Sequence, residues 1–113
     1  ICDRFVDSTY AYQVVANKIN KKFNSINQKY ILKDLKPNLT IVLKSDFKTI
    51  FSRIRKRKKI NKFDKLKKDF YKKAQNAFLG RAKNNKSYYV FDSSKNTPDL
   101  EKKVFKLIIE NLK

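Results

Sequence analysis

The sequence predicts an α/β domain built around a layered parallel sheet. Two short segments, residues 39–43 and 87–91, consist of β-branched, aromatic and other apolar residues apart from Ser87, a composition typical of strands that are buried on both faces. Helical patterns separate the two segments, and strands joined through helices pair in parallel by right-handed crossovers. The length of 113 residues allows one domain, which buries roughly 65% of the surface that its unfolded chain exposes.

The first third of the chain predicts two helices after a strand end. Ile1-Cys2 precedes the polar Asp3 in the manner of the tail of a strand. A helix is expected from Ser8 to about Lys18, and a second from about Lys22 to Lys33. The second helix has apolar residues on one side, at Phe23, Ile26 and Tyr30, and Lys36-Pro37-Asn38 ends it.

A third helix follows the first predicted strand. Its apolar residues recur at i, i+3, i+4 and i+7, which gives one buried stripe: Phe47, Ile50, Phe51 and Ile54. Ser45 or Asp46 precedes this stripe, and either side chain is a favourable N-cap. The helix ends in the basic run RIRKRKK at 53–59.

Two further helices flank the second strand. A helical face spans about 65–83, with the lone glycine, Gly80, near its end, and the strand at 87–91 then leads into a loop at 92–96. Thr97 and Pro98 suit the N-cap and first position of a last helix. The apolar residues of that helix are Leu100, Val104, Leu107, Ile108 and Leu112.

Composition excludes several classes of protein. With one cysteine, Cys2, the chain has no internal disulfide, and without histidine it has none of the metal sites or catalytic triads that depend on imidazole. The apolar runs are far shorter than the ~20 residues of a membrane span. We therefore expect no membrane-spanning segment.

The formal net charge of +19 is compatible with binding to nucleic acid. Lys, Asn, Ile, Phe and Tyr, all with A/T-rich codons, make up more than half of the chain, so genome composition accounts for much of the charge. An RNA- or DNA-binding domain that uses RIRKRKK and the tyrosines is the alternative interpretation. It is disfavoured because the lysines occur almost everywhere and the aromatic residues follow core periodicity.

Arginine is informative against this lysine background, because its planar fork binds phosphate in a bidentate way that lysine cannot reproduce. The chain has five arginines: Arg4, Arg53, Arg55, Arg57 and Arg81. Three of them lie within the basic run. An equally simple interpretation is that these three are exposed to solvent at the end of a helix, where the helix dipole favours positive charge. Arg81 is interpreted as structural or solvated.

The segment DRFVDSTYAYQ at 3–13 gathers polar groups in a lysine-poor stretch. In a helix, Thr9 and Gln13 are i and i+4 and share a face, with Ser8 and Tyr12 one step round it. This arrangement predicts a small polar pocket. The structural alternative makes Thr9 and Gln13 solvated positions and Tyr12 a core aromatic.

Three segments in this order resemble the second half of bacterial thymidylate kinase: DRFVDSTYAYQ, then KPNLTIVL followed by RIRKRKKINKFD, then YYVFDSS. The resemblance implies a P-loop NTPase fold of the nucleoside monophosphate kinase type, with a three-layer parallel sheet that is incomplete because the N-terminal strands and phosphate loop are absent. Residues 1–113 are then the C-terminal part of one kinase domain, with a lid at about 55–64. We expect an N-terminal part of a longer protein to be missing.

The implied activity is transfer of the γ-phosphate of ATP to thymidine monophosphate (dTMP), giving the diphosphate (dTDP), with Mg²⁺ as the metal. The resemblance further implies a cytoplasmic enzyme that forms a homodimer when complete, with no specific nucleic acid and no membrane as partner. A single glycine rules out a GxxxxGK[ST] loop within these 113 residues. This chain alone is therefore expected to be inactive, and a non-catalytic kinase-like fragment remains an alternative.

The resemblance also implies roles for residues near the acceptor nucleotide. Asp3 lies near the phosphates and acts on magnesium indirectly, through a metal-bound water, and Arg4 grips the acceptor phosphate. Thr9 and Gln13 face thymine, with Ser8 beside them. Tyr12 packs near the deoxyribose and disfavours a 2′-hydroxyl. A glutamine carboxamide offers one donor and one acceptor, which match two adjacent positions on the thymine edge.

On the ATP side, the resemblance makes Arg53 the arginine that stacks on adenine, with Arg57 as a further nucleotide-binding residue. The turn at Ser93 and Ser94 approaches the adenine with its backbone groups. Lys62 stands where many bacterial members carry a catalytic lid arginine. The sequence departs from those members after Ala-Tyr-Gln, where glycines are usual and this chain reads VVAN at 14–17.

Overall fold

The computed structural model describes residues 1–57 and 67–113. It contains two strands, β1 at Thr40–Lys44 and β2 at Tyr88–Asp92, which pair in parallel in a register that runs from Thr40 opposite Tyr88 to Lys44 opposite Asp92. Two helices, α3 at Phe47–Lys56 and α4 at Lys68–Lys83, follow β1 and precede β2 along the chain. The predicted strands and their parallel pairing are confirmed.

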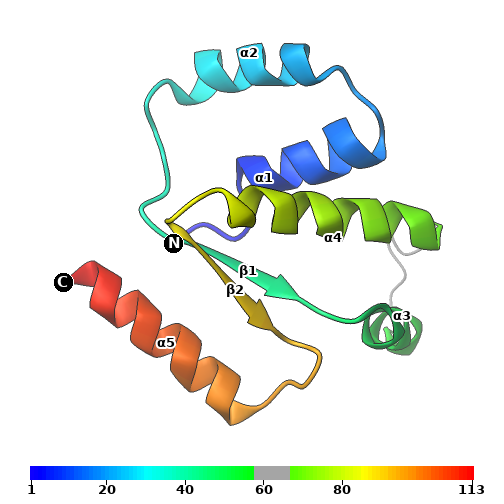
Figure 1. Ribbon diagram of the computed structural model, residues 1–113, viewed down its shortest axis with the longest axis vertical. Coiled ribbons are helices and arrows are strands. Elements are labelled where there is room, and N and C mark those ends of the chain that lie inside the picture. Colours follow the sequence, from blue (N-terminus) through cyan, green and yellow to red (C-terminus); the bar gives the residue numbers. More distant parts are fainter. Residues whose placement is uncertain (58–66) are drawn as a thin grey trace.

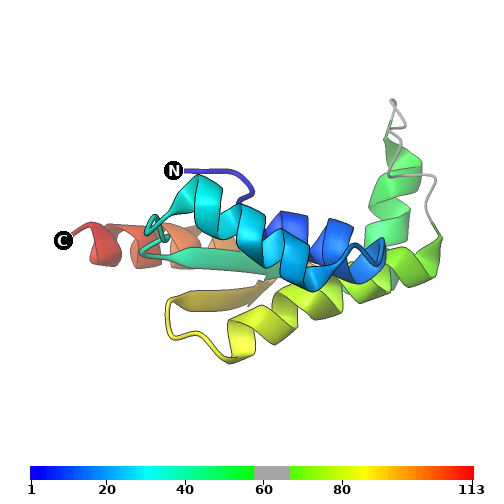
Figure 2. The same ribbon diagram turned by 90° about the horizontal axis from the view of Figure 1, so that it is seen from above.

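Helices lie on both sides of these strands. Figure 1 shows α4 on one side and the last helix, α5 at Pro98–Leu112, on the other, which is the predicted three-layer order. The N-terminal helices lie beyond α4: α1 at Val6–Thr9, the π-helix η1 at Tyr10–Ala16, and α2 at Lys21–Leu32. Figure 2 shows from above that α4 runs beside the α1–η1 helix.

The best-buried side chains lie between this first helix and α4. They come from η1 and from one stripe of α4: Ala11, Val14, Phe70, Ala74 and Ala82. Small alanines bring the two helices close together, and Phe70 fills the space between them. The core therefore holds the first helix, which carries most of the predicted acceptor residues, against α4.

The strands are less buried than the sequence predicts. Leu43 is 57% exposed, and Tyr89 and Val90 are each 41% exposed. The prediction that both strands are buried on both faces is thus wrong for this chain. The physical reason is that the described residues supply a sheet of only two strands, so each strand has a free edge and incomplete helical cover.

Ile1 and Cys2 form no strand, contrary to the prediction. Both residues are exposed and neither pairs with β1 or β2. A strand depends on backbone hydrogen bonds to a neighbour, and the described residues place none beside this segment.

The first helix begins at Val6, two residues before the predicted start, and changes from an α-helix to a π-helix at Tyr10. At its end the backbone N–H of Asn17 donates to the carbonyl of Tyr12, five residues earlier, at 3.2 Å. π-Helical turns are rare and occur frequently at functional sites. Residues four apart still share a face, so the predicted proximity of Thr9 and Gln13 survives this change.

The helix starts agree largely with the predicted caps. Asp46 rather than Ser45 caps α3, accepting from the backbone N–H of Thr49 at 2.8 Å and from its hydroxyl at 2.9 Å. Thr97 occupies the N-cap position of α5 before Pro98, but its hydroxyl makes no capping hydrogen bond. In residues 1–57 and 67–113, no helix is both long and apolar enough to cross a membrane.

Candidate functional site

Arg4 and Tyr12 form the first cluster of predicted site residues. One guanidinium nitrogen of Arg4, Nη2, donates to the Tyr12 hydroxyl at 3.2 Å, and Cζ of Arg4 lies 5.1 Å from the centre of the Tyr12 ring. The Arg4 backbone has a φ of 68°, in the left-handed region, and its carbonyl accepts from the Cys2 thiol at 3.2 Å. The turn before the first helix thus brings the arginine back over that helix.

Tyr12 is also packed against two aromatic side chains of α4. Its ring centre lies 5.7 Å from that of Phe70 and 6.0 Å from that of Phe78, the second pair in an edge-to-face arrangement. Such aromatic pairs favour defined ring orientations. Tyr12 is therefore a packed aromatic, as the structural alternative held, and it also contacts the predicted phosphate-binding arginine.

Thr9 and Gln13 lie in a groove between the first helix and α2, with a volume of about 370 Å³. Their predicted position on one face is confirmed, whereas Tyr12 does not line this groove. The groove is lined by Val6, Thr9, Gln13, Ile19, Phe23, Asn24, Asn27, Gln28, Ile31 and Leu32.

The groove mixes apolar walls with amide groups. The side-chain amide of Asn17 donates to Oε1 of Gln13 at 3.3 Å, and the buried Nε2 of Gln28 has no hydrogen-bond partner within the described part of the chain. A buried donor without a partner is costly. The groove therefore offers hydrogen-bonding groups to a ligand with both donors and acceptors. The sequence patterns did not point to Gln28.

Asp7 anchors the first helix and was missed by the sequence reasoning. It is only 6% exposed, forms an ion pair with Nε of Arg81 at 2.5 Å, and accepts from the Tyr88 hydroxyl at 2.8 Å. Arg81 also lies over the Tyr10 ring, with Cζ 4.8 Å from its centre. Burial, followed by the bond to Asp7, raises the pKa of Tyr88. Arg81 is thus structural, one of the two roles predicted for it.

A sequence signal for Asp7 does exist. Asp7, Ala11 and Val14 are i, i+4 and i+7, and all three are buried. A carboxylate on the apolar stripe of a helix requires a cationic or hydrogen-bonding partner. The pattern identifies the need for that partner, but only the fold identifies Arg81 and Tyr88.

Arg53 and the Ser93–Ser94 turn form the second cluster. Nη2 of Arg53 donates to the carbonyl of Ser93 at 2.7 Å and to that of Ser94 at 3.3 Å. Arg53 lies in α3, after β1, and the two serines follow β2. The carboxyl ends of parallel strands meet at one edge of the sheet. Arg53 therefore lies next to two serines that follow it by 40 and 41 positions in the sequence.

The turn is fixed to the end of β1 by further hydrogen bonds. The backbone N–H and hydroxyl of Ser93 donate to the carbonyl of Lys44 at 2.8 and 2.9 Å, and the hydroxyl oxygen of Ser94 accepts from the backbone N–H of Asp46 at 2.9 Å. The side-chain hydrogen bond from Ser94 lowers the pKa of Asp92. The backbone N–H of Thr49 lowers the pKa of Asp46.

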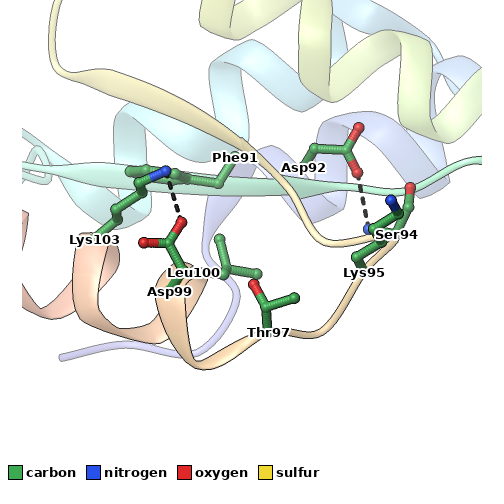
Figure 3. Close-up of a pocket in the computed structure, with 8 residues that line it drawn as sticks. All are labelled: Phe91, Asp92, Ser94, Lys95, Thr97, Asp99, Leu100 and Lys103. Carbon is green, nitrogen blue, oxygen red and sulfur yellow. Dashed lines mark hydrogen bonds and ion pairs between the residues drawn. The ribbon is translucent and has the colours of Figure 1, made fainter.

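A pocket of about 440 Å³ lies beside this turn, between the end of β2 and the start of α5 (Figure 3). Lys103 pairs with Asp99 at 2.8 Å on the α5 side, and the backbone N–H of Ser94 donates to Asp92 at 2.8 Å on the strand side. Ser94 lines the pocket, while Arg53 and Ser93 do not. The second cluster therefore meets this pocket only through Ser94.

The other predicted residues are less enclosed. Asp3 and Arg57 are exposed, with Arg57 at the end of α3, and Ser8 is half-buried. Lys62 and most of the predicted lid at 55–64 lie outside the described residues.

Within the described ranges, no group of three or more Cys, Asp or Glu side chains is placed to hold a metal ion. Asp3 offers one exposed carboxylate, which is compatible with Mg²⁺ because this ion commonly keeps several waters and uses few protein ligands.

Comparison with known proteins gives consistent matches. The family model described as thymidylate kinase matches residues 1–104. A protein of that name from Mycoplasma capricolum is 36% identical over 120 residues, covering 100% of this chain and 54% of the relative. One from the Aster yellows witches'-broom phytoplasma is 34% identical over 117 residues with the same coverage, and one from Pseudomonas syringae is 28% identical over 113 residues, covering 99% and 54%. The chain thus spans about half the length of the curated relatives it matches.

Proposed function

The chain belongs to the thymidylate kinase family, and we propose on that premise that it is the C-terminal part of an enzyme that transfers the γ-phosphate of ATP to dTMP. We name Arg4, Thr9, Tyr12 and Gln13 the acceptor cluster, and Arg53, Ser93 and Ser94 the donor cluster. The observation that carries the proposal is the groove in which Thr9 and Gln13 lie together on the helix that also carries Tyr12 and its contact to Arg4.

The acceptor cluster suits a pyrimidine nucleotide. Gln13 presents a carboxamide and Thr9 a hydroxyl to the groove, which can match the acceptor and donor groups on one edge of thymine. Arg4 is exposed and carries five N–H donors in a planar fork, suited to a phosphate. Tyr12 lies next to Arg4, where its ring can contact the sugar.

The donor cluster suits the adenine of ATP. The bonds from Arg53 to the Ser93 and Ser94 carbonyls fix the guanidinium on the turn, and its exposed plane can stack on a purine ring. Arg57, one helical turn after Arg53, adds positive charge for the phosphates. Lys62, from the basic segment that follows α3, is the proposed lid residue of the reaction.

Phosphoryl transfer depends on positioning and charge neutralisation more than on a strong base, so a chain without histidine is suited to it. Magnesium bound with the nucleotide neutralises phosphate charge, and Asp3 would hold a water of that ion. Arg4 would orient the acceptor phosphate. We further propose that the complete enzyme is a cytoplasmic homodimer.

The test is a chimera in which the N-terminal half of the Mycoplasma capricolum relative precedes this chain. The chimera should form dTDP from dTMP and ATP, whereas the 113-residue chain alone should not. In the chimera, Gln13→Ala should weaken dTMP binding by roughly 1–3 kcal/mol, the cost of leaving buried polar groups unpaired. ATP affinity should not change.

Asn76→Ala is the matched control, since Asn76 is an exposed amide on α4. It should leave both affinities unchanged. A folded chimera that forms no dTDP would support the non-catalytic alternative. An equal loss of dTMP and ATP affinity in Gln13→Ala would make Gln13 a structural residue.

A further inference from the structure

Arg4 is held in a conformation that an arginine rarely adopts by itself. Its φ of 68° lies in the left-handed region, which costs an L-residue with a side chain roughly 1–2 kcal/mol. Such strain persists only where the surroundings fix the residue, and it is concentrated at functional sites. Here the Cys2 thiol bonds the Arg4 carbonyl and Tyr12 bonds the guanidinium.

The contact with Tyr12 restrains an otherwise exposed side chain. A free arginine side chain carries about 2 kcal/mol of rotamer entropy. The 3.2 Å hydrogen bond to the Tyr12 hydroxyl occupies the Nη2 end of the fork, and the ring beneath Cζ restricts its tilt. The remaining N–H donors of the fork stay available for a bidentate anion.

Tyr12 is in turn fixed by α4, a helix more than fifty residues later in the chain. Its ring packs on Phe70 and Phe78, and Phe70 is only 8% exposed. Phe70 also makes an edge-to-face contact with Tyr71, whose ring meets that of Phe51 in α3. A continuous series of aromatic contacts therefore links α3 and α4 to the ring that holds Arg4.

We propose that Tyr12 is a positioning residue that orients the Arg4 guanidinium toward the acceptor phosphate, and that Phe70 and Phe78 set the position of Tyr12. This inference rests on the proposed function, because the phosphate role of Arg4 is assigned there. It adds to that function a role for the tyrosine hydroxyl that is separate from contact with the sugar. It also assigns a role to Phe70 and Phe78, which act through Tyr12.

The decisive variant is Tyr12→Phe, which keeps the ring packed on Phe70 and Phe78 and removes only the hydroxyl. In the chimera we expect kcat to fall about tenfold, through lost alignment of the phosphate. Affinity for dTMP should fall while affinity for thymidine, which lacks the phosphate, stays unchanged. Phe70→Leu and Phe78→Leu should change the same ratio of affinities in the same direction by a smaller factor.

Tyr10→Phe is the matched control, because Tyr10 lies in the same helix but its ring faces Arg81 and Lys21 rather than Arg4. It should leave kcat and the dTMP-to-thymidine affinity ratio unchanged. Equal losses of dTMP and thymidine affinity in Tyr12→Phe would overturn the inference, since a sugar contact or general loosening would produce them.

A second measurement separates this inference from the proposed function. The Nε–H NMR signal of Arg4 in the 113-residue chain can be assigned from its loss in Arg4→Lys, because the chain has only five arginines. We expect the order parameter of this N–H to fall in Tyr12→Phe and to stay unchanged in Tyr10→Phe. An unchanged value in Tyr12→Phe would overturn the inference even if the chimera were fully active. An inactive chimera with the expected NMR change would overturn the proposed function alone.

Discussion

The acceptor cluster and the donor cluster are built in different ways. Arg4, Tyr12 and Gln13 lie within ten consecutive residues on one turn and one helix, so local geometry brings them together. Arg53 meets Ser93 and Ser94 only because β1 and β2 pair in parallel and end at the same edge. The first cluster therefore depends on how its helix is held against α4, and the second depends on the sheet.

The largest effect is expected from a substitution that detaches the first helix, which carries most of the acceptor cluster, from α4 and β2. Asp7→Ala removes the buried partner of Arg81 and Tyr88, and we expect the free energy of unfolding to fall by about 3 kcal/mol, the lower end of the range for a broken buried pair, because Arg81 is partly exposed. Urea unfolding measures this change. Asp69→Ala, which removes an exposed and solvent-screened ion pair with Lys73, is the control and should have a much smaller effect. Equal effects would show that Asp7 does not anchor the helix.

The next effect is on the acceptor cluster itself. Arg4→Lys keeps the charge and loses the planar fork, so the rate of dTDP formation in the chimera should fall at least about tenfold, or about 1.4 kcal/mol. Lys102→Gln, which removes an exposed charge on α5, should leave the rate unchanged. A silent Arg4→Lys would place the phosphate-binding charge elsewhere in the chain.

A smaller effect is expected at the donor cluster. Arg53→Lys loses the paired hydrogen bonds to the Ser93 and Ser94 carbonyls, which should lower the free energy of unfolding by about 1 kcal/mol. In the chimera the KM for ATP should rise and the KM for dTMP should stay constant. A matching rise in both constants would mean that the two clusters are not independent.

The smallest effect is expected at low pH, where protonation of two carboxylates should weaken hydrogen bonds beside the donor cluster. The pKa values of Asp46 and Asp92 are lowered from the ordinary value of 3.8 by hydrogen bonds from Thr49 and Ser94. Their stabilising contribution is therefore present above about pH 4 and is lost as the pH falls through the folded-state pKa values. The amide NMR signals of Thr49 and Ser94 should shift in that acidic range.

Asp46→Asn is the control for this titration, because asparagine still caps a helix but does not ionise. It should abolish the acid shift of the Thr49 amide and leave the shift of the Ser94 amide, whose partner is Asp92. A Thr49 amide that still titrates in Asp46→Asn would assign the shift to another group.

Short-range patterns in the sequence determined the elements and part of the acceptor cluster. The i, i+4 spacing placed Thr9 and Gln13 on one face, the β-branched runs located β1 and β2, and Asp46 was one of two candidates for the cap of α3. These features depend on interactions within a few residues, so a pattern in the chain is sufficient to indicate them.

The tertiary structure decided every contact between distant segments. These contacts join residues that are separated by 40 to 81 positions in the sequence. They are the bonds to Asp7, the packing of Tyr12 on Phe70 and Phe78, and the bonds from Arg53 to the turn at 93–94. The exposure of Leu43 and the unpaired Ile1 also follow from which elements lie beside them. The type of a residue indicates whether its side chain requires a polar partner or burial. Only the folded chain determines which residue is that partner, because burial and long-range contacts depend on all the elements at once.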